Sequence, residues 1–219
     1  TTGLDDIRRN AAMSDREKME ARGGREEKRD LWGAYRHHVM QFMHPKLLDG
    51  SRTLKVVIDA SNGMAGTMVP KVFSDVPGLK ITKLNFDNST GEFVHEPNPL
   101  VESNLEQLQE AVKAGKADLG ICFDGDADRC VVVDEHGVTV GCDHLTAWLS
   151  TIFLKDNPGS AIVYDLRSTK ALAEMITDAG GKPVKSRVGH VFMKQALADH
   201  EGVFAGELSG HFYFRRNFY

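Results

Sequence analysis

Short apolar segments that end in or next to an aspartate alternate with helical patterns along most of the chain. LKVVIDA (54–60), DLGICF (118–123) and AIVYDL (161–166) have the length and apolar composition of buried strands. Helical patterns separate them, and this alternation favours an α/β fold with parallel strands. Open α/β sheets bind ligands at the carboxyl ends of their strands, where these aspartates fall.

Further patterns predict two sheets, both mixed. CVVVDEHGVTVG (130–141) has the pattern of a hairpin turning at His136-Gly137, and HFYFRR (211–216) is predicted to return antiparallel. DNPGS (156–160) is the best boundary signal, and the strand–helix rhythm restarts after it. We therefore predict two consecutive mixed-sheet α/β domains, preceded by a charged helical linker. The predicted bounds are 1–44 for the linker and the tail of a preceding domain, 45–156 for the first α/β domain and 157–219 for the second.

Local patterns also predict how particular helices begin and pack. Apolar residues recur at helical spacing from Leu31 to Met43, which predicts a packed helix leading into the first domain. Ser103 and Glu106 have the spacing of a capping box before a helix that runs to about residue 115. Asp143 is predicted to cap the helix that follows the hairpin.

Composition excludes several classes of function. The 219 residues carry a formal net charge of −4, without the basic surface typical of nucleic-acid binding. The apolar runs are far shorter than the ~20 residues that span a bilayer, and no secretory leader pattern is present. Cys122, Cys130 and Cys142 lack the spacing of a zinc site or disulfide framework and favour a reducing cytoplasm. The absence of an initial Met and the abrupt end predict a segment of a longer protein.

The most informative motif is CFDGDADRC (122–130), which places Asp124, Asp126 and Asp128 at alternate positions. Two carboxylates about 4 Å apart repel by about 1 kcal/mol in water and about 4 kcal/mol at a protein-like dielectric constant. A hard divalent cation is the simplest compensation, and Mg²⁺ prefers such oxygen ligands while keeping positions for water or phosphate. The motif therefore predicts a magnesium site.

Two other interpretations of the triplet are weaker. An EF-hand loop also begins D-x-D-x-D, and Glu135 falls at its twelfth position, but Arg129 occupies the sixth, where that loop needs glycine. The predicted flanks are also strands rather than helices. A solvated turn without an ion is the second interpretation, and the position at a strand end disfavours it.

Arg129 and the segment GELSGH (206–211) complete the candidate chemistry. Arg129 either neutralises the neighbouring acids or holds a phosphate, and the sequence leaves these roles open. Glu207, Ser209 and His211 alternate in a glycine-flanked loop and offer acceptors, a hydroxyl and a titratable ring. Such groups suit sugar hydroxyls and proton transfer, although His211 alone is equally typical of a structural histidine.

Together, in this order, the two motifs give the chain a resemblance to the α-D-phosphohexomutase family of phosphoglucomutases, phosphomannomutases and phosphoglucosamine mutases. DGDADR is similar to the magnesium loop of that family, and GELSGH to its sugar-recognition loop. The segments VVIDASNGMAG, HEPNPL, YDLRST (164–169) and RVGH (187–190) also resemble family segments. The resemblance covers most of the chain from about Leu54 and implies the second and third domains of a four-domain enzyme.

The resemblance implies a role for each matching residue. Mg²⁺ would be bound by Asp124, Asp126 and Asp128. The phosphorylated hexose would be bound by Glu207, Ser209, His190, Gly189 and Arg167. His211 would transfer a proton, and Arg129 would contact the phosphate on a catalytic serine. The implied reaction interconverts hexose 1-phosphate and hexose 6-phosphate through a phosphoserine, with hexose 1,6-bisphosphate as the intermediate.

The sequence departs from the family pattern in two places. It contains neither the T-A-S-H-N-P type loop of the first domain, which supplies the serine, nor the R-x-S-G-T-E-P type loop of the fourth. We therefore expect this chain alone to be inactive. Ser61 has the wrong motif context for a substitute nucleophile. The alternatives are a noncatalytic protein that binds sugar phosphate or metal and, more weakly, an Asp-nucleophile phosphatase. The hexose stays open among glucose, mannose and glucosamine phosphates.

Overall fold

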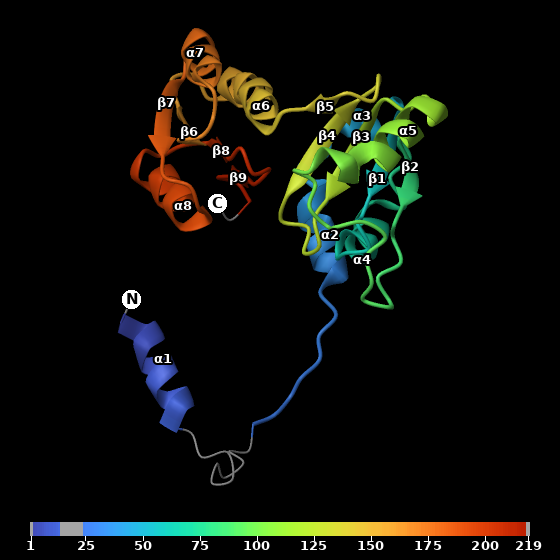
Figure 1. Cartoon of the computed structure of the whole chain (residues 1–219). Coiled ribbons are helices and arrows are strands. Elements are labelled where there is room, and N and C mark those ends of the chain that lie inside the picture. The colour runs from blue at the N-terminus through green and yellow to red at the C-terminus, as the bar shows by residue number, and fades with distance from the viewer. Residues whose placement is uncertain (1, 14–23, 218–219) are drawn as a thin grey trace.

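The computed structural model describes residues 2–13 and 24–217 and contains two α/β units (Figure 1). The strands of the first unit are β1 (Leu54–Asp59), β2 (Leu79–Leu84), β3 (Leu119–Phe123), β4 (Cys130–Asp134) and β5 (Thr139–Val140). Their order is β2-β1-β3-β4-β5. β1 is parallel to β2 and β3, whereas β4 is antiparallel to β3 and β5. The predicted hairpin and mixed sheet are confirmed.

Helices cover both faces of this sheet. α4 (Ala65–Phe73) packs on the face that carries Val56 and Ile58. The 3-10 turn η2 (Glu102–Leu105) and α5 (Glu106–Gly115) pack on the opposite face, against Val57. Successive residues of β1 thus enter two different cores, which is why its sequence is a continuous apolar run.

The second unit repeats this connectivity. Its strands are β6 (Ala161–Asp165), β7 (Lys182–Ser186), β8 (Phe204–Gly206) and β9 (Phe212–Phe214), in the order β7-β6-β8-β9. β6 is parallel to β7 and β8, and β9 returns antiparallel to β8, as predicted. α6 (Cys142–Asp156) and α7 (Lys170–Asp178) pack on one face, and α8 (His190–Asp199) packs on the other.

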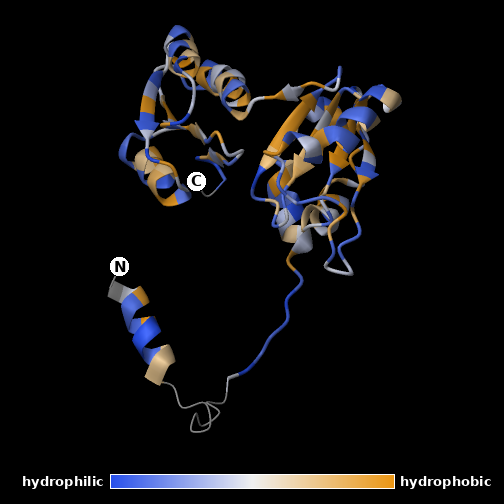
Figure 2. Cartoon of the chain, in the orientation of Figure 1, coloured by the Kyte–Doolittle hydropathy of each residue, from blue (hydrophilic) through white to orange (hydrophobic). Residues whose placement is uncertain are grey.

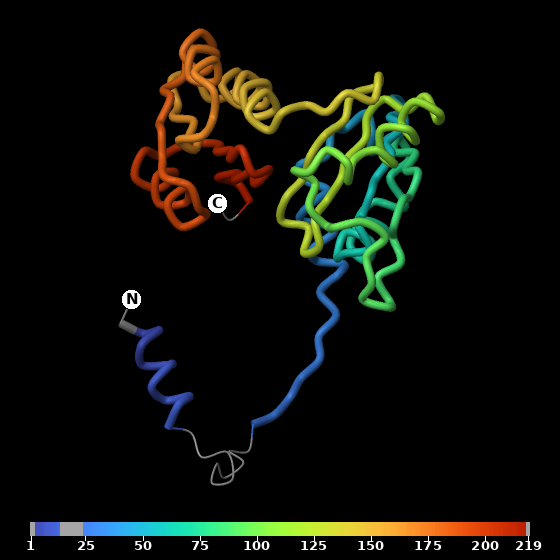
Figure 3. The backbone as a smooth tube through the Cα atoms, in the orientation of Figure 1, coloured from blue at the N-terminus to red at the C-terminus, as the bar shows by residue number. Residues whose placement is uncertain are grey.

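Helix α6 lies at the junction between the units. The backbone passes from the first unit to the second in the segment between β5 and α6 (Figure 3). Ala147 and Leu154 of α6 belong to the core that also contains Ile162 and Phe204. The domain bounds predicted from the sequence stay a prediction, and a division before Cys142 would keep α6 with the side chains that it contacts.

The N-terminal part of the predicted linker is exposed. The described side chains of α1 (Thr2–Met13) face solvent, and the segment 24–30 is exposed and hydrophilic (Figure 2). The part of the predicted linker at 14–23 lies outside the described residues. Within the described part of the chain, none of the helices combines the length and apolar character needed to cross a membrane.

The helix predicted at 31–43 is present but is not packed in a core. α2 (Trp32–Met40) has no buried residue, and α3 (Pro45–Leu48) follows it. Its contacts with α4 are peripheral: the Arg36 Nε–H donates to the carbonyl oxygen of Val72, and the Lys71 ammonium lies 4.3 Å from the centre of the Trp32 ring. Tyr35 remains 41% exposed. The predicted helix therefore packs against α4 but buries none of its residues fully, because part of its apolar surface lines an open groove.

Both predicted helix caps were wrong. α5 begins after Leu105 without a side-chain cap, because η2 adds a turn in which Ser103 is internal. The Asn104 amide instead donates to the Asn98 carbonyl oxygen at 2.9 Å. The N-cap of α6 is Gly141, whereas Asp143 lies within the first turn and accepts from the backbone N–H of His144.

Phe204 provides a test of the second core. Its ring is fully buried and packs against Phe153, Phe212 and Phe214. Phe204→Ala should lower the free energy of unfolding by about 3–5 kcal/mol, because it leaves a cavity among these rings. Phe93→Ala is the control, since Phe93 is 49% exposed and its loss should cost within about 0.5 kcal/mol. Urea unfolding of both variants measures the difference, and equal midpoints would contradict this account.

Candidate active site

The aspartate triplet lies in the loop that joins β3 to β4, at the carboxyl end of β3. Asp124 is buried, whereas Asp126 and Asp128 are exposed, and one carboxylate oxygen from each lies within 4.8 Å of the others. Ala127 between them has a φ of +64°, a left-handed conformation that costs roughly 1–2 kcal/mol for a residue other than glycine. This turn brings the acids together, and three carboxylates form the oxygen donor set that Mg²⁺ prefers.

Arg129 forms an ion pair with the first acid of the triplet. Its Nε lies 2.5 Å from Asp124 Oδ2, and its backbone N–H donates to Asp124 Oδ1. Its Nη1 lies 3.5 Å from Asn98 Oδ1, at the long limit of a hydrogen bond. Each carboxylate oxygen has two lone pairs, so these contacts leave Asp124 able to bind a cation as well.

The turn between β1 and α4 contacts the backbone of the triplet loop at Gly125. The Met64 N–H donates to the Gly125 carbonyl oxygen at 2.9 Å. A Cβ on Gly63 would come within 2.4 Å of the same oxygen, so only glycine allows this approach. Ser61 is fully buried in this turn, and its hydroxyl donates to the Phe123 carbonyl oxygen at 2.6 Å. These contacts favour the structural interpretation of Ser61.

The sugar-loop candidates lie between β8 and β9, around the buried carboxylate of Glu207. One oxygen, Oε1, accepts from the Gly189 N–H at 2.7 Å. The other, Oε2, accepts from the hydroxyls of Ser209 at 3.1 Å and Tyr213 at 3.5 Å. Burial and the Glu207 carboxylate raise the pKa of Tyr213, so its hydroxyl remains a donor. Glu207 thus organises its own loop and joins it to the N-terminus of α8.

Arg167 is held beside this loop by Asp165, the last residue of β6. Asp165 Oδ2 lies 2.7 Å from Arg167 Nη2 and accepts from the Leu208 N–H at 2.8 Å. Burial by itself raises the pKa of Asp165, but the Arg167 guanidinium and the N–H groups of Leu208 and Arg167 outweigh burial and lower the pKa below its ordinary value. The same pairing raises the pKa of Arg167.

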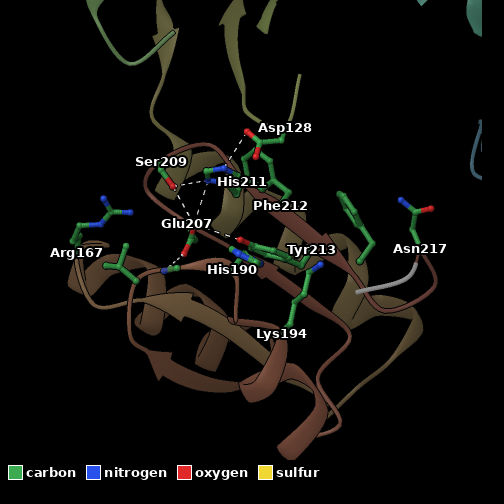
Figure 4. A pocket seen from close by; sticks show the side chains of 13 residues that line it. Asp128, Arg167, His190, Lys194, Glu207, Ser209, His211, Phe212, Tyr213 and Asn217 are labelled. Atoms are coloured by element: carbon green, nitrogen blue, oxygen red, sulfur yellow. Dashed lines mark hydrogen bonds and ion pairs between the residues drawn. The ribbon is translucent and has the colours of Figure 1, made fainter. Parts of the chain in front are cut away.

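One cavity of about 650 Å³ collects most of the predicted site residues (Figure 4). Among the residues that line it are Asp128, Arg167, Gly189, His190, Glu207, Ser209 and His211. Asp124, Asp126 and Arg129 do not line it. The sequence reasoning missed Lys194, Tyr213 and Asn217, which also line it. The four-residue spacing from His190 was the available signal for Lys194, because it places both on one helix face.

The two candidate loops contact each other directly. His211 Nε2 lies 3.2 Å from Asp128 Oδ1, and His211 Nδ1 lies 2.9 Å from the Ser209 hydroxyl. The Cys130 N–H donates to the Gly210 carbonyl oxygen at 3.1 Å. The triplet and GELSGH motifs, distant in the sequence, are therefore neighbours in the folded chain.

The cysteines do not offer an alternative nucleophile. All three are free. Burial raises the pKa of Cys122 and of Cys130 to about 12 and that of Cys142 to about 11. A nucleophilic cysteine needs a lowered pKa instead.

Comparison with known proteins identifies the family. The model described as phosphoglucomutase/phosphomannomutase α/β/α domain II matches residues 34–137, and the model of domain III matches 142–219. The chain therefore belongs to the phosphohexomutase family and corresponds to these two domains.

Individual relatives agree with this assignment. A phosphoglucomutase of Neisseria meningitidis is 35% identical over 90% of this chain and 41% of its own length. A phosphomannomutase of Escherichia coli is 35% identical over 98% of this chain and 47% of its own. A solved phosphoglucomutase/phosphomannomutase family protein from Burkholderia thailandensis, 30% identical, superposes with a TM-score of 0.86 over 99% of this chain and 45% of that one. The chain thus spans less than half the length of these relatives.

The pH dependence of the free energy of unfolding in the acid range tests the Asp165–Arg167 pair. The pKa of Asp165 is lower in the folded state than in the unfolded chain, so as the pH falls the unfolded chain binds the proton first. The stability that ionised Asp165 contributes is therefore fully present above its unfolded pKa of about 3.9. It is lost as the pH falls through the pKa of the folded state. Asp165→Asn should be less stable at pH 7 but lose less stability than wild type from pH 5 to pH 2. Exposed Asp178 provides the control variant Asp178→Asn. Urea unfolding at each pH measures this, and an equal loss of stability from pH 5 to pH 2 in Asp165→Asn and wild type would contradict it.

Proposed function

We propose that this chain is the metal-binding and sugar-binding part of a phosphohexomutase that moves a phosphoryl group between O1 and O6 of a hexose. The observation that carries the proposal is the 3.2 Å contact between Asp128 and His211, which joins the triplet to the sugar-loop cavity. A cation and a sugar bound at these two places would be neighbours, as phosphoryl transfer requires. Family membership gives this geometry its chemical context.

Asp124, Asp126 and Asp128 are the proposed ligands of Mg²⁺. The ion would neutralise charge that develops on the transferring phosphoryl group. Arg129 is the proposed contact for the phosphate on a serine supplied by the first domain. Its Nη2 has no partner among the described residues, so one side of the guanidinium fork can bind phosphate oxygen while Nε holds Asp124.

The second unit would bind and orient the hexose. Ser209 lies on the wall of the cavity, where its hydroxyl is the proposed hydrogen-bonding group for the sugar, and Glu207 fixes the loop that carries it. Arg167 and His190 lie on the wall of the same cavity. The cavity therefore presents several polar contacts that a sugar ring can satisfy at once.

His211 is the proposed proton-transfer residue. When the phosphoserine donates its phosphoryl group to a hydroxyl of the hexose monophosphate, a P–O bond to the sugar forms, and the bond to the serine breaks with its electron pair staying on the serine oxygen. The proton of that hydroxyl passes to His211, whose ring lies between Asp128 and Ser209. The product is hexose 1,6-bisphosphate, which reorients and returns the other phosphoryl group to the serine.

The substrate class includes glucose and mannose phosphates, because relatives at equal identity are named for each. A cytoplasmic location is proposed from the three free thiols.

Metal binding by the triplet is directly testable with Mn²⁺ as a spectroscopic substitute for Mg²⁺. Asp126→Asn should weaken Mn²⁺ binding on the order of tenfold to a hundredfold, because it removes one of three charged ligands. Glu135→Gln is the matched control, since Glu135 is exposed and lies outside the cluster. Electron paramagnetic resonance of free Mn²⁺ measures both. An equal loss of Mn²⁺ affinity in both variants would instead favour an EF-hand arrangement. Unchanged Mn²⁺ affinity in both variants would contradict the proposed metal site.

Turnover distinguishes the enzyme from a noncatalytic binding protein. The 219 residues alone should show no conversion of glucose 1-phosphate or mannose 1-phosphate with Mg²⁺ and hexose 1,6-bisphosphate, because they contain no serine loop. The full-length product of the same gene should convert one of them in a coupled assay. Substantial turnover by the 219 residues would refute the role of the missing serine. An inactive full-length protein would favour sugar-phosphate binding without catalysis.

A further inference from the structure

We propose that His95 is a positioning residue for Arg129. A largely buried contact between His95 and Asp59 fixes the segment 95–98, and this segment holds the Arg129 guanidinium in place. The importance of Arg129 rests on the proposed function, but the positioning itself does not. Neither His95 nor Asp59 lines the cavity described above.

Asp59 is the last residue of β1 and its side chain has no exposed surface. The Ser61 N–H donates to Oδ1 at 2.8 Å, and the Asn85 amide lies 3.0 and 3.2 Å from the two oxygens. The remaining partner of Oδ2 is His95 Nε2, at 3.1 Å. A buried carboxylate needs such partners, and loss of one of them is costly.

Both ring nitrogens of His95 face acceptors. Nδ1 lies 2.8 Å from the Glu96 carbonyl oxygen, and Nε2 faces the Asp59 carboxylate. Which nitrogen carries the hydrogen depends on the tautomer, and either tautomer donates to one of these two acceptors. The side chain is only 15% exposed, so the pair is shielded from solvent and fixes the ring from two directions.

Residues 97 and 98 connect the fixed His95 to the triplet loop between β3 and β4. The Pro97 ring lies over Gly125, where an added Cβ would be 3.7 and 3.8 Å from two of its carbons. Asn98 is tied by its carbonyl oxygen to the Asn104 amide, and its Oδ1 faces Arg129 Nη1 at 3.5 Å. Asp124 holds Arg129 at Nε. The guanidinium therefore has a short contact at Nε and a longer one at Nη1, and the longer one depends on the loop that His95 anchors.

Hydrogen exchange of the Arg129 Nε–H, followed by ¹⁵N NMR on the 219-residue chain, tests the proposal. Arg129→Lys identifies the resonance. His95→Ala and Asn98→Ala should each speed exchange by about threefold to tenfold, the equivalent of one hydrogen bond. His95→Gln keeps an N–H donor for Asp59 and should restore most of the protection. His136→Gln is the control, because His136 is an exposed histidine in the β4–β5 turn, and it should change nothing.

Unchanged exchange in folded His95→Ala and Asn98→Ala would overturn the proposal. So would His95→Gln exchanging as fast as His95→Ala. If His95→Ala does not fold, Asn98→Ala decides, because it leaves the buried pair intact. No metal or sugar is present in this measurement, so its outcome is independent of whether the triplet binds Mn²⁺.

Discussion

Burial of carboxylates at the ends of parallel strands is the constraint on which this structure depends. Asp59, Asp124, Asp165 and Glu207 each follow or end a strand, and none is more than 2% exposed. A buried charge is tolerated only where donors surround it, and here each acid receives at least one hydrogen bond from the loop that follows its strand. Every one of these acids therefore orders a loop, and the ordered loops form the walls of the candidate active site.

The repeated connectivity of the two units explains how two kinds of chemistry come together. The triplet loop joins β3 to β4, and the GELSGH loop joins β8 to β9, so the two occupy equivalent positions. Asp124 and Glu207 are the first residues after equivalent strands. One unit uses this position to gather carboxylates, whereas the other uses it to build a hydrogen-bonding loop. Their contact at Asp128 and His211 brings the carboxylate cluster next to the GELSGH loop.

The sequence predicted those parts of the fold that depend on local patterns. Apolar runs predict buried strands, and the acids at the strand ends are the next residues in the chain. The predicted caps at Ser103 and Asp143 failed because the 3-10 turn and Gly141 moved the helix starts, which the capping pattern does not encode. Residues that act through distant contacts were also missed. Lys194 and Asn217 enter the cavity only after folding, and the pairing of His95 with Asp59 spans 36 residues without a periodic signal.

Phe212 gives the junction between the units a mechanical property. Its ring packs against the core of the first unit and also against that of the second, one residue after His211. Rotation of one unit against the other would withdraw this ring from apolar surroundings and expose it to water. Burial of this one ring therefore favours the arrangement in which the two units stay in contact beside the cavity.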